Sequence, residues 1–340
     1  MAWRSFVDSS PAGSIYSYPE YLDVLCRATG GSFRILGVFK GGEIHGGIAL
    51  YERNSGAGRI LAGRLLLYYN GILLKDFGGK YPSVKSSREL AILAALEAAL
   101  SGAGFAHTHI RNRHPITDLR VFLDRGWAAR PSYSLLMRLD DLAETFTRIE
   151  QNQRRLIRRC EEEGAVLSSD DDFDVFYQMH LDTHLRKGAP LYLPEKSFRS
   201  YFNDLRSQNL CRLFQVRLKD GTPAACQMVL LGDHSVTHTV TAAAVPDFLR
   251  LGTTPFLRWK VCEALAGEGY LGNDLTDASL NEVTRFKAQL GGELVTNFVL
   301  SRPDSARYRA SRTIGKGAGQ VRTILGKGFR ALRTLPLLRR

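Results

Sequence analysis

The densest cluster of charged side chains that could bind a substrate is a run of arginines near the middle of the chain. Arg154, Arg155, Arg158 and Arg159 lie within six residues of the stretch QRRLIRRCEEEGAVL. Because the guanidinium fork matches the oxygen spacing of a phosphate, such a helix can bind a phosphate group. Alternating charges along a helix are also typical of a solvated face, here one that pairs with Glu161–Glu163. Composition alone favours the solvated face.

A second candidate for anion binding is the turn LGTTP, which ends at Pro255. Thr253 or Thr254 can cap a helix that has Pro255 in its first turn. The free N–H groups at a helix start can bind an anion. Of a glycine-rich pyrophosphate loop, only Arg250 and Gly252 are present. The turn therefore predicts a helix start and gives weak support for a phosphate site.

Polar residues gather where the expected strand 270–275 ends. The strand reaches Asp274, and Asp277 and Ser279 follow within a few residues. Polar side chains at the carboxyl end of a sheet strand commonly line a site in α/β proteins. The next expected helix carries Lys287. The alternative, which the pattern alone favours, is that Asp277 or Ser279 caps this helix and Lys287 is a surface charge.

Cysteine and histidine usage does not indicate a metal centre. The five cysteines are odd in number and form no CxxC pair, which disfavours a disulfide framework and a zinc site. Free thiols in the cytoplasm fit this usage best. His107, His109 and His114 lie close in sequence but have no acidic or thiol partner beside them. We therefore expect no bound metal.

The elements that would position these residues occur twice along the chain. The hairpin pattern of 33–51 returns at 211–231, each with a tight turn between two apolar strands. In both copies an apolar helix (90–104 or 255–269), a short strand (105–110 or 270–275), a helix and a final strand (134–139 or 295–300) follow in the same order. The first copy carries an extra insertion, 58–77. The sequence therefore predicts two α/β modules of similar plan.

The length and the boundaries agree with two modules. With 340 residues, 44% of them hydrophobic, the chain can fill two cores of ordinary size. We expect one domain over 1–145, a second over 146–303 and a basic tail over 304–340. The boundary region contains no Pro/Gly/Ser linker, so the modules are expected to pack against each other.

The tail is strongly basic. After Ala306 there are ten basic residues and no acidic one, which accounts for most of the net charge of +12. Apolar residues such as Val321, Leu325 and Leu332 recur at helical spacing, a pattern typical of a helix lying on anionic lipid. A solvated tail and a nucleic-acid contact are the alternatives. The N-terminus has no secretory pattern and no stretch suits a membrane span, so we expect a cytoplasmic protein at the inner membrane face.

Several motifs occur in an order that resembles a known family. After QRRLIRRCEEEGAVL come HLDTHLRKGAPLYLPEKSF, KDGTPAACQ, LGTTPFLRW, YLGNDLTDAS and RFKAQLGGE. Together they resemble the FemABX peptidyltransferases and the related BioF2-like acetyltransferase domain. The likeness covers 151–300 and extends more loosely to the first module. It implies two tandem GNAT-like domains, of the acyl-CoA N-acyltransferase type, with mixed sheets.

The resemblance also implies roles for individual residues. Phe286 and Lys287 match the family's FK pair, in which the lysine stabilises charge on the reacting carbonyl or the donor phosphate. Asp274 matches an aspartate and is the candidate proton acceptor. Arg159 matches a residue that binds the acceptor's diphosphate. The resemblance implies that Arg159, Arg27 from the first domain, Tyr192 in the acceptor groove and Phe286 bind substrate. The arginine run and the helix start add Arg155, Arg158, Thr253 and Thr254 to the expected substrate-binding set.

The implied reaction is attack by a neutral amine on an ester or thioester carbonyl, with Lys287 holding the oxyanion. We expect no bound cofactor, and the acyl donor is aminoacyl-tRNA or acyl-CoA. The donor stays open because the chain lacks both the helical arm of some members and a complete pyrophosphate loop. The expected acceptor is an amine on a peptidoglycan or polysaccharide precursor, linked to a lipid or a nucleotide.

Two other functions are open. One is an acyl-CoA-dependent GNAT enzyme that acts on a small amine or an exopolysaccharide intermediate. The other is a binding module without catalysis that holds nucleic acid or membrane.

Overall fold

The structure of the chain is a computed structural model that describes residues 2–64 and 66–312. The first half contains a long hairpin, a helix laid along it and the strands that follow. Its elements are α1 (Ala2–Ser9), η1 (Ile15–Ser17), α2 (Pro19–Thr29), β1 (Ser32–Lys40), β2 (Glu43–Ser55), β3 (Gly58–Ala62), β4 (Ile72–Leu74), α3 (Pro82–Gly102), β5 (His107–Asn112), α4 (Arg120–Asp124) and β6 (Ala128–Arg138).

The second half repeats this plan with more helices before its hairpin. Its elements are α5 (Leu142–Arg148), α6 (Gln151–Glu162), β7 (Val166–Ser168), α7 (Phe173–Lys187), α8 (Glu195–Arg206), β8 (Cys211–Arg217), β9 (Pro223–Leu230), β10 (Val236–Ala244), η2 (Pro246–Leu251), α9 (Thr253–Gly267), β11 (Gly272–Asp277), α10 (Glu282–Gln289) and β12 (Glu293–Ser301). Both expected hairpins are present, as β1–β2 and β8–β9.

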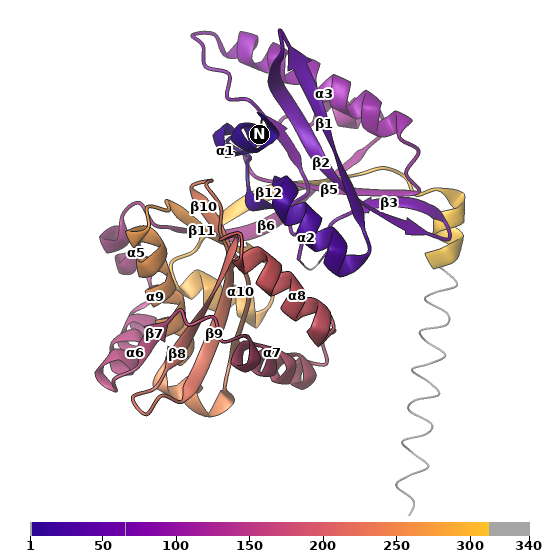
Figure 1. The fold of residues 1–340 in the computed structure, drawn as a ribbon. Helices are drawn as coiled ribbons and strands as arrows, with labels where there is room; N and C mark the ends of the chain where they lie inside the picture. The colour runs from indigo at the N-terminus through magenta and orange to yellow at the C-terminus, as the bar shows by residue number, and fades with distance from the viewer. Residues whose placement is uncertain (1, 65, 313–340) are drawn as a thin grey trace, which may run out of the picture.

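The strands of both halves join one mixed sheet. Its order is β1-β2-β3-β5-β12-β6-β11-β10-β9-β8-β7, with β4 paired to β2. Figure 1 shows the first half above the second, with β6, β11 and β12 between them. The last strand, β12, pairs with β5 and β6 of the first half. The expected α/β class with mixed sheets is therefore confirmed, and the division into domains at 145 and 303 stays a prediction.

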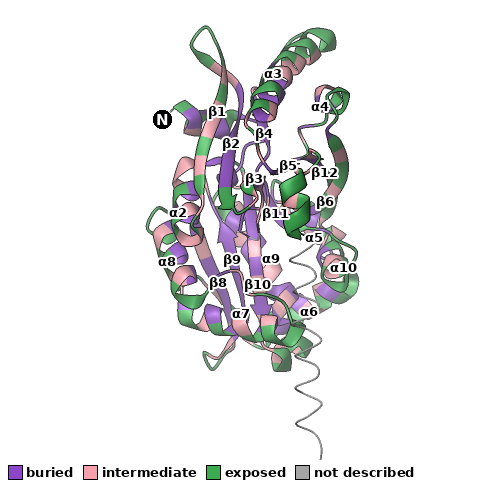
Figure 2. Cartoon of the chain, turned by 90° about the vertical axis from the view of Figure 1, so that its right-hand side faces the viewer, coloured by how far each residue is buried: buried purple, intermediate pink, exposed green. Residues whose placement is uncertain are grey.

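Two hydrophobic cores flank the sheet, and one of them runs across both halves. It includes Tyr21 of α2 and Tyr201 of α8, both buried, whose hydroxyl oxygens lie 2.9 Å apart. The second core lies beneath α5, α6 and α9 and includes Phe256 and Cys262. Figure 2 shows the buried strands β8 and β9 beside α8 and above α7, and both helices carry exposed residues. The halves thus pack together, as the missing linker predicts.

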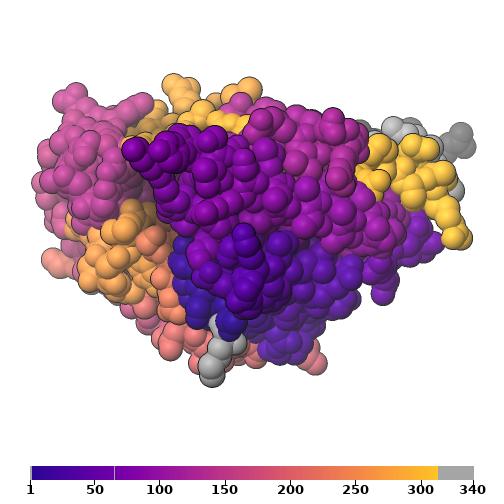
Figure 3. Space-filling view, turned by 90° about the horizontal axis from the view of Figure 1, so that it is seen from above, coloured from indigo at the N-terminus to yellow at the C-terminus, as the bar shows by residue number. Residues whose placement is uncertain are grey.

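The chain returns to the first half after β12. His107 lies 2.6 Å from a carboxylate oxygen of Asp304 and stacks on Tyr308, with ring centroids 4.7 Å apart. Residues 306–312 are helical. Figure 3 shows this segment in yellow at the edge of the first half. The apolar and basic residues of the predicted amphipathic tail, from Lys316 onward, lie outside the described residues.

Candidate acyl-transfer site

The site begins where two parallel strands of the second half separate. β10 and β11 pair only from Val236 to His238 against Gly272 to Asp274. Beyond this point β10 continues along β9, with an irregularity between Thr239 and Thr241, and β11 has one between Asp274 and Asp277. The gap holds a cavity of about 280 Å³, which we call the central cavity. It is lined by Thr183, His184, Lys187, Tyr192, Thr239, Val240, Thr241, Ala242, Arg258, Leu275, Thr276, Asp277, Val283 and Lys287.

Lys287 reaches this gap from α10, which Asn281 caps by accepting from the Thr284 N–H. Its Nζ donates to the carbonyl oxygens of Leu275 and Asp277, each at 2.7 Å. The ammonium has three donors, so one stays free for a ligand. Lys287 is only 8% exposed, and the surface charge that the pattern alone favours is therefore wrong.

Burial, together with the nearby positive charge of Arg258, lowers the pKa of Lys287 to about 8. The carboxylates of Asp277 and Asp274 act in the opposite direction. Lys287 is still mostly protonated at neutral pH, because its pKa lies above 7. It can therefore donate to a developing oxyanion, and it binds the strand that forms the cavity wall.

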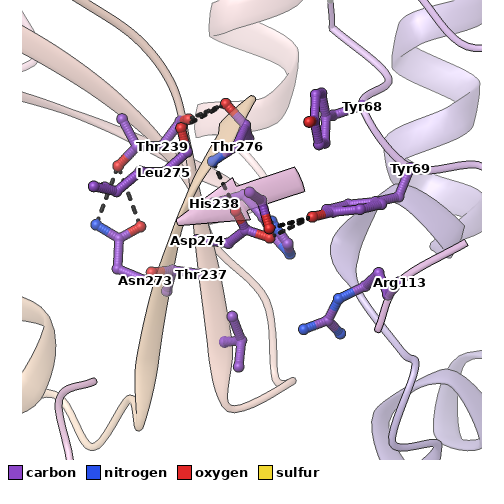
Figure 4. Close-up of polar contacts among 12 residues, drawn as sticks. Tyr68, Tyr69, Arg113, Thr237, His238, Thr239, Asn273, Asp274, Leu275 and Thr276 are labelled. Atoms are coloured by element: carbon purple, nitrogen blue, oxygen red, sulfur yellow. Dashed lines mark hydrogen bonds and ion pairs between the residues drawn. The ribbon is translucent and has the colours of Figure 1, made fainter. Parts of the chain in front are cut away.

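Asp274 lies behind the cavity wall, between the two halves. Its carboxylate accepts from the Tyr69 hydroxyl at 2.7 Å and from the Thr276 N–H at 2.7 Å (Figure 4). The ring of His238 lies close, with its Nδ1 3.8 Å from the carboxylate. Burial raises the pKa of Asp274, while the Tyr69 hydrogen bond and the charge of Arg113 oppose this. Asp274 lines neither the central cavity nor the two cavities that adjoin it.

The two hydrogen bonds of Asp274 connect the first half to the cavity wall. Thr276 has φ of +57°, a conformation that is costly for a β-branched residue. The Asp274 carboxylate stabilises this turn by accepting the Thr276 N–H. The carbonyls on either side of Thr276 are those that hold Lys287. Asp274 therefore acts on the position of Lys287 through the backbone.

A larger cavity of about 420 Å³ adjoins the central cavity on the side of α6, α9 and α10, and we call it the outer cavity. It is lined by Gln153, Leu156, Thr183, Arg186, Lys187, Ala242, Ala243, Ala244, Leu249, Thr254, Pro255, Arg258, Glu282, Val283 and Phe286. Of the predicted residues, Thr254 and Phe286 line it. The Thr254 hydroxyl is buried and has no partner, whereas the Thr253 hydroxyl donates to the Phe248 carbonyl at 3.2 Å.

Gly252 sets the approach of α9 to α6 beside this cavity. Its φ is +93°, which disfavours residues with a Cβ atom. An added Cβ would lie 2.5 Å from the Leu156 carbonyl oxygen. Close packing therefore requires the glycine of the LGTTP turn. The expected helix start is confirmed, but the N-cap residue is Gly252 without a side-chain cap, so the predicted cap by Thr253 or Thr254 is wrong.

A third cavity, of about 640 Å³, lies between the halves, and we call it the inter-half cavity. It is lined by Arg53, Gly63, Arg64, Leu67, Tyr68, His109, Arg111, Tyr192, Val240, Thr276 and Asp277. Three arginines face one carboxylate there. The Arg111 guanidinium also lies over the Tyr68 ring, 4.2 Å from its centroid. The cavity therefore attracts anions, and sequence reasoning missed Arg53, Arg64 and Arg111 because no motif contains them.

The three cavities share wall residues and form a row. Thr183 and Arg258 line both the outer and the central cavity. Tyr192, Thr276 and Asp277 line both the central and the inter-half cavity. Tyr192 also donates to the Val240 carbonyl at 3.3 Å. The central cavity with Lys287 thus lies between a mostly apolar chamber and a basic one.

The remaining predicted residues lie elsewhere. Arg155, Arg158 and Arg159 are exposed on α6 and line none of the three cavities. Arg155 donates to the Asn152 side chain, and the Arg158 guanidinium lies over the Phe146 ring. Arg27 forms ion pairs with Asp23 and Asp204 on the outer face of α2 and α8. Their substrate-binding roles stay predictions.

Across residues 2–64 and 66–312, no cluster of three or more His, Cys, Asp or Glu side chains is arranged to hold a metal ion. Within the same ranges, no helix is long and apolar enough to cross a membrane.

The comparisons with known proteins agree with this geometry. Residues 147–287 match the family model described as an acetyltransferase (GNAT) domain. This segment contains the central cavity, Arg258 and Lys287. Residues 147–287 therefore match a GNAT acyltransferase domain, which supports an acyltransferase, and the expected resemblance to tandem GNAT-like proteins is confirmed in the fold.

Solved structures show the same fold over most of the chain. FemX has a TM-score of 0.69 at 13% identity, over 87% of this chain and 94% of FemX. The C-terminal domain of a protein named as a lysylphosphatidylglycerol synthetase, from Agrobacterium fabrum, has a TM-score of 0.55 at 14% identity, over 83% and 87%. A tandem GNAT protein from the clavulanic acid biosynthesis pathway has a TM-score of 0.50 at 13% identity, over 88% and 91%. Among curated proteins, no sequence matches.

Proposed function

We propose that this protein transfers an acyl or aminoacyl group onto an amine of an anionic cell-envelope precursor. The observation that carries the proposal is the row of three cavities, with Lys287 in the middle one. An acyl donor would enter through the outer cavity and the acceptor through the inter-half cavity. Their reacting atoms would then meet beside the free donor of Lys287.

The acceptor class follows from the charge of the inter-half cavity. Arg53, Arg64 and Arg111 line it, with Asp277 as its one acidic residue. Arginine forks bind phosphate oxygens well, so a phosphate- or diphosphate-linked acceptor fits. The name of the Agrobacterium neighbour, a lysylphosphatidylglycerol synthetase, also refers to an aminoacylated phosphate compound.

The proposed step is direct transfer. The amine nitrogen attacks the acyl carbon, a C–N bond forms, and the C–S or C–O bond to the donor breaks. Lys287 stabilises the oxyanion of the tetrahedral intermediate with its third N–H. Asp277, which lines both the central and the inter-half cavity, accepts the proton that the amine loses and passes it to the leaving sulfur or oxygen, so that the donor departs as a thiol or an alcohol. In this proposal Asp274 positions Lys287 and does not exchange protons with substrate.

The donor that the GNAT domain favours is an acyl-CoA, since enzymes of this fold use acyl-CoA as co-substrate. The start of α9 at Thr253 and Thr254 offers free N–H groups to a phosphate. Aminoacyl-tRNA, which the FemABX resemblance implies, is the other donor to be tested. The second candidate is an acyl-CoA-dependent enzyme that acts on a small uncharged amine. The apolar outer cavity favours binding of the acyl-CoA donor in that reaction.

The test is a transfer assay with labelled donors. Acetyl-CoA, a set of longer acyl-CoAs and a pool of charged tRNA are each offered with a nucleotide-linked muropeptide and with its dephosphorylated form. We expect label on the amine of the phosphorylated acceptor, and at least about tenfold less label when Arg64→Met and Arg111→Met are combined. Equal transfer to both acceptor forms would reject the anionic acceptor. If the protein binds the acceptor but transfers label from none of the donors, the result would support a binding module without catalysis.

A further inference from the structure

Arg258 lines two of the cavities in the row and has no ionic partner among the described residues. Arg258 lies on α9, and its Nε and Nη1 atoms are buried without a hydrogen-bond partner. None of the ion pairs within residues 2–64 and 66–312 involves it. Burial lowers its pKa to about 10, so it is a cation at neutral pH. Arg258 as a whole is partly exposed, but two of its guanidinium nitrogens are shielded from water and have no partner, so a ligand anion would offset that loss of hydrogen bonds.

The position of Arg258 indicates which part of a ligand it meets. It lines the outer and the central cavity and lies where the two join. It follows Thr253, the first residue of α9, by five residues, which is about 7.5 Å along the helix axis. A phosphate at the helix start would thus leave Arg258 facing the acyl end of the donor. The hydroxyl of Thr183, also buried and without a partner, lies in both cavity walls.

The surroundings restrict the chemistry of that acyl end. Ala242, Ala243, Val283 and Phe286 give the outer cavity an apolar wall, and the charged residues Arg186, Lys187 and Glu282 line it as well. An acyl chain with methylene groups and a terminal anion would satisfy both the wall and the guanidinium. Carboxylate is the anion for which the planar fork of arginine is well matched.

We infer that Arg258 binds a carboxylate on the acyl group, so that the preferred donor carries a dicarboxylic or acidic aminoacyl moiety. The inference rests on the proposed function for the identity of the ligand as an acyl donor. The binding of a carboxylate to Arg258 can be measured without turnover.

The first experiment is calorimetric titration of the full chain with glutarate, with its neutral analogue glutaramide and with inorganic phosphate. The variants are Arg258→Met, Arg258→Lys and the control Arg285→Met, whose side chain is exposed on α10. We expect wild type and Arg285→Met to bind glutarate, and Arg258→Met to bind it at least about tenfold more weakly. Arg258→Lys should fall between them, because it keeps the charge and loses the fork. Glutaramide should bind to none of them.

Three results would overturn the inference: glutarate binding by Arg258→Met at wild-type strength, no glutarate binding by wild type, or Arg258-dependent binding of phosphate alone. The melting temperature of each variant shows whether a loss of glutarate binding comes from misfolding. Because Arg258→Met removes two buried donors that have no partner, it should melt at or above the wild-type temperature.

A second experiment compares glutaryl-CoA with butyryl-CoA in the transfer assay. We expect kcat/KM to favour glutaryl-CoA by about tenfold or more in wild type and to lose this preference in Arg258→Met. Transfer without that preference would reject the Arg258 inference and keep the proposed function. Arg258-dependent glutarate binding without transfer from either donor would reject the proposed function and keep the assignment of Arg258 as a carboxylate-binding residue.

Discussion

Replacing Lys287 by methionine should change how the stability of the fold depends on pH. The pKa of Lys287 is about 8 in the folded chain, against an ordinary value of 10.5. Below pH 8 the folded state therefore carries a buried ammonium at a cost of about 3 kcal/mol relative to a solvated one. Between pH 8 and 10.5 the folded lysine loses its proton while the unfolded one keeps it. The unfolding free energy of wild type should therefore rise with pH in this window.

The assay is urea unfolding of wild type, Lys287→Met and Lys196→Met at pH 7 and pH 10. Lys196 is an exposed lysine on α8, so its removal serves as the control. The wild-type stability minus that of Lys287→Met should increase by about 2–3 kcal/mol from pH 7 to pH 10, and other titrating groups cancel in this difference. The difference against Lys196→Met should stay flat. A flat or falling difference for Lys287→Met would refute the buried ammonium on which the site rests.

Three further substitutions test the elements around the site. Tyr69→Phe removes a donor to the buried Asp274 carboxylate; it should cost about 1–2 kcal/mol in urea unfolding and lower kcat, whereas Tyr68→Phe should cost less than half as much. Gly252→Ala should cost about 2–4 kcal/mol because its Cβ meets the Leu156 carbonyl, while Gly188→Ala, which meets no atom within 4 Å, should cost about 1 kcal/mol. Glu97→Ala should lower the melting temperature and cost about 2 kcal/mol, since the buried carboxylate accepts from Arg125 and Trp127. Equal losses of stability for the two tyrosine variants or for the two glycine variants would contradict these predictions, as would an unchanged melting temperature for Glu97→Ala.

The repeated elements could be predicted because each depends on local signals. Apolar runs with a tight turn between them specify the hairpins β1–β2 and β8–β9 wherever they occur. The family motif predicts a role for Lys287 in the site, whereas its sequence environment alone favours a surface charge. Burial of an ammonium depends on carbonyls freed by the separation of β10 and β11, and a local pattern does not contain that information.

The rest of the site depends on contacts between distant segments. Arg111 and Asp277 line one cavity although 165 positions separate them, because β12 lies between β5 and β6 in the sheet. Local patterns do not fix the order of strands. Arg258 stands in an ordinary helical stretch, LRWK, and only the packed structure shows that it lacks a partner. An arginine in an expected apolar helix, with no acidic residue three or four positions away, is the signal that the sequence offers.

The most direct measurement is the rate of acyl transfer by Lys287→Met and Lys287→Arg beside wild type and the control Lys196→Met, with kcat and KM determined separately from pH 6 to pH 9.5. If Lys287 stabilises the oxyanion, kcat for Lys287→Met should fall by about 10²–10³ with KM nearly unchanged, and wild-type kcat should decline as the pH rises past about 8. A wild-type kcat for Lys287→Met, or a loss confined to KM, would contradict the assignment of Lys287 to the reacting carbonyl.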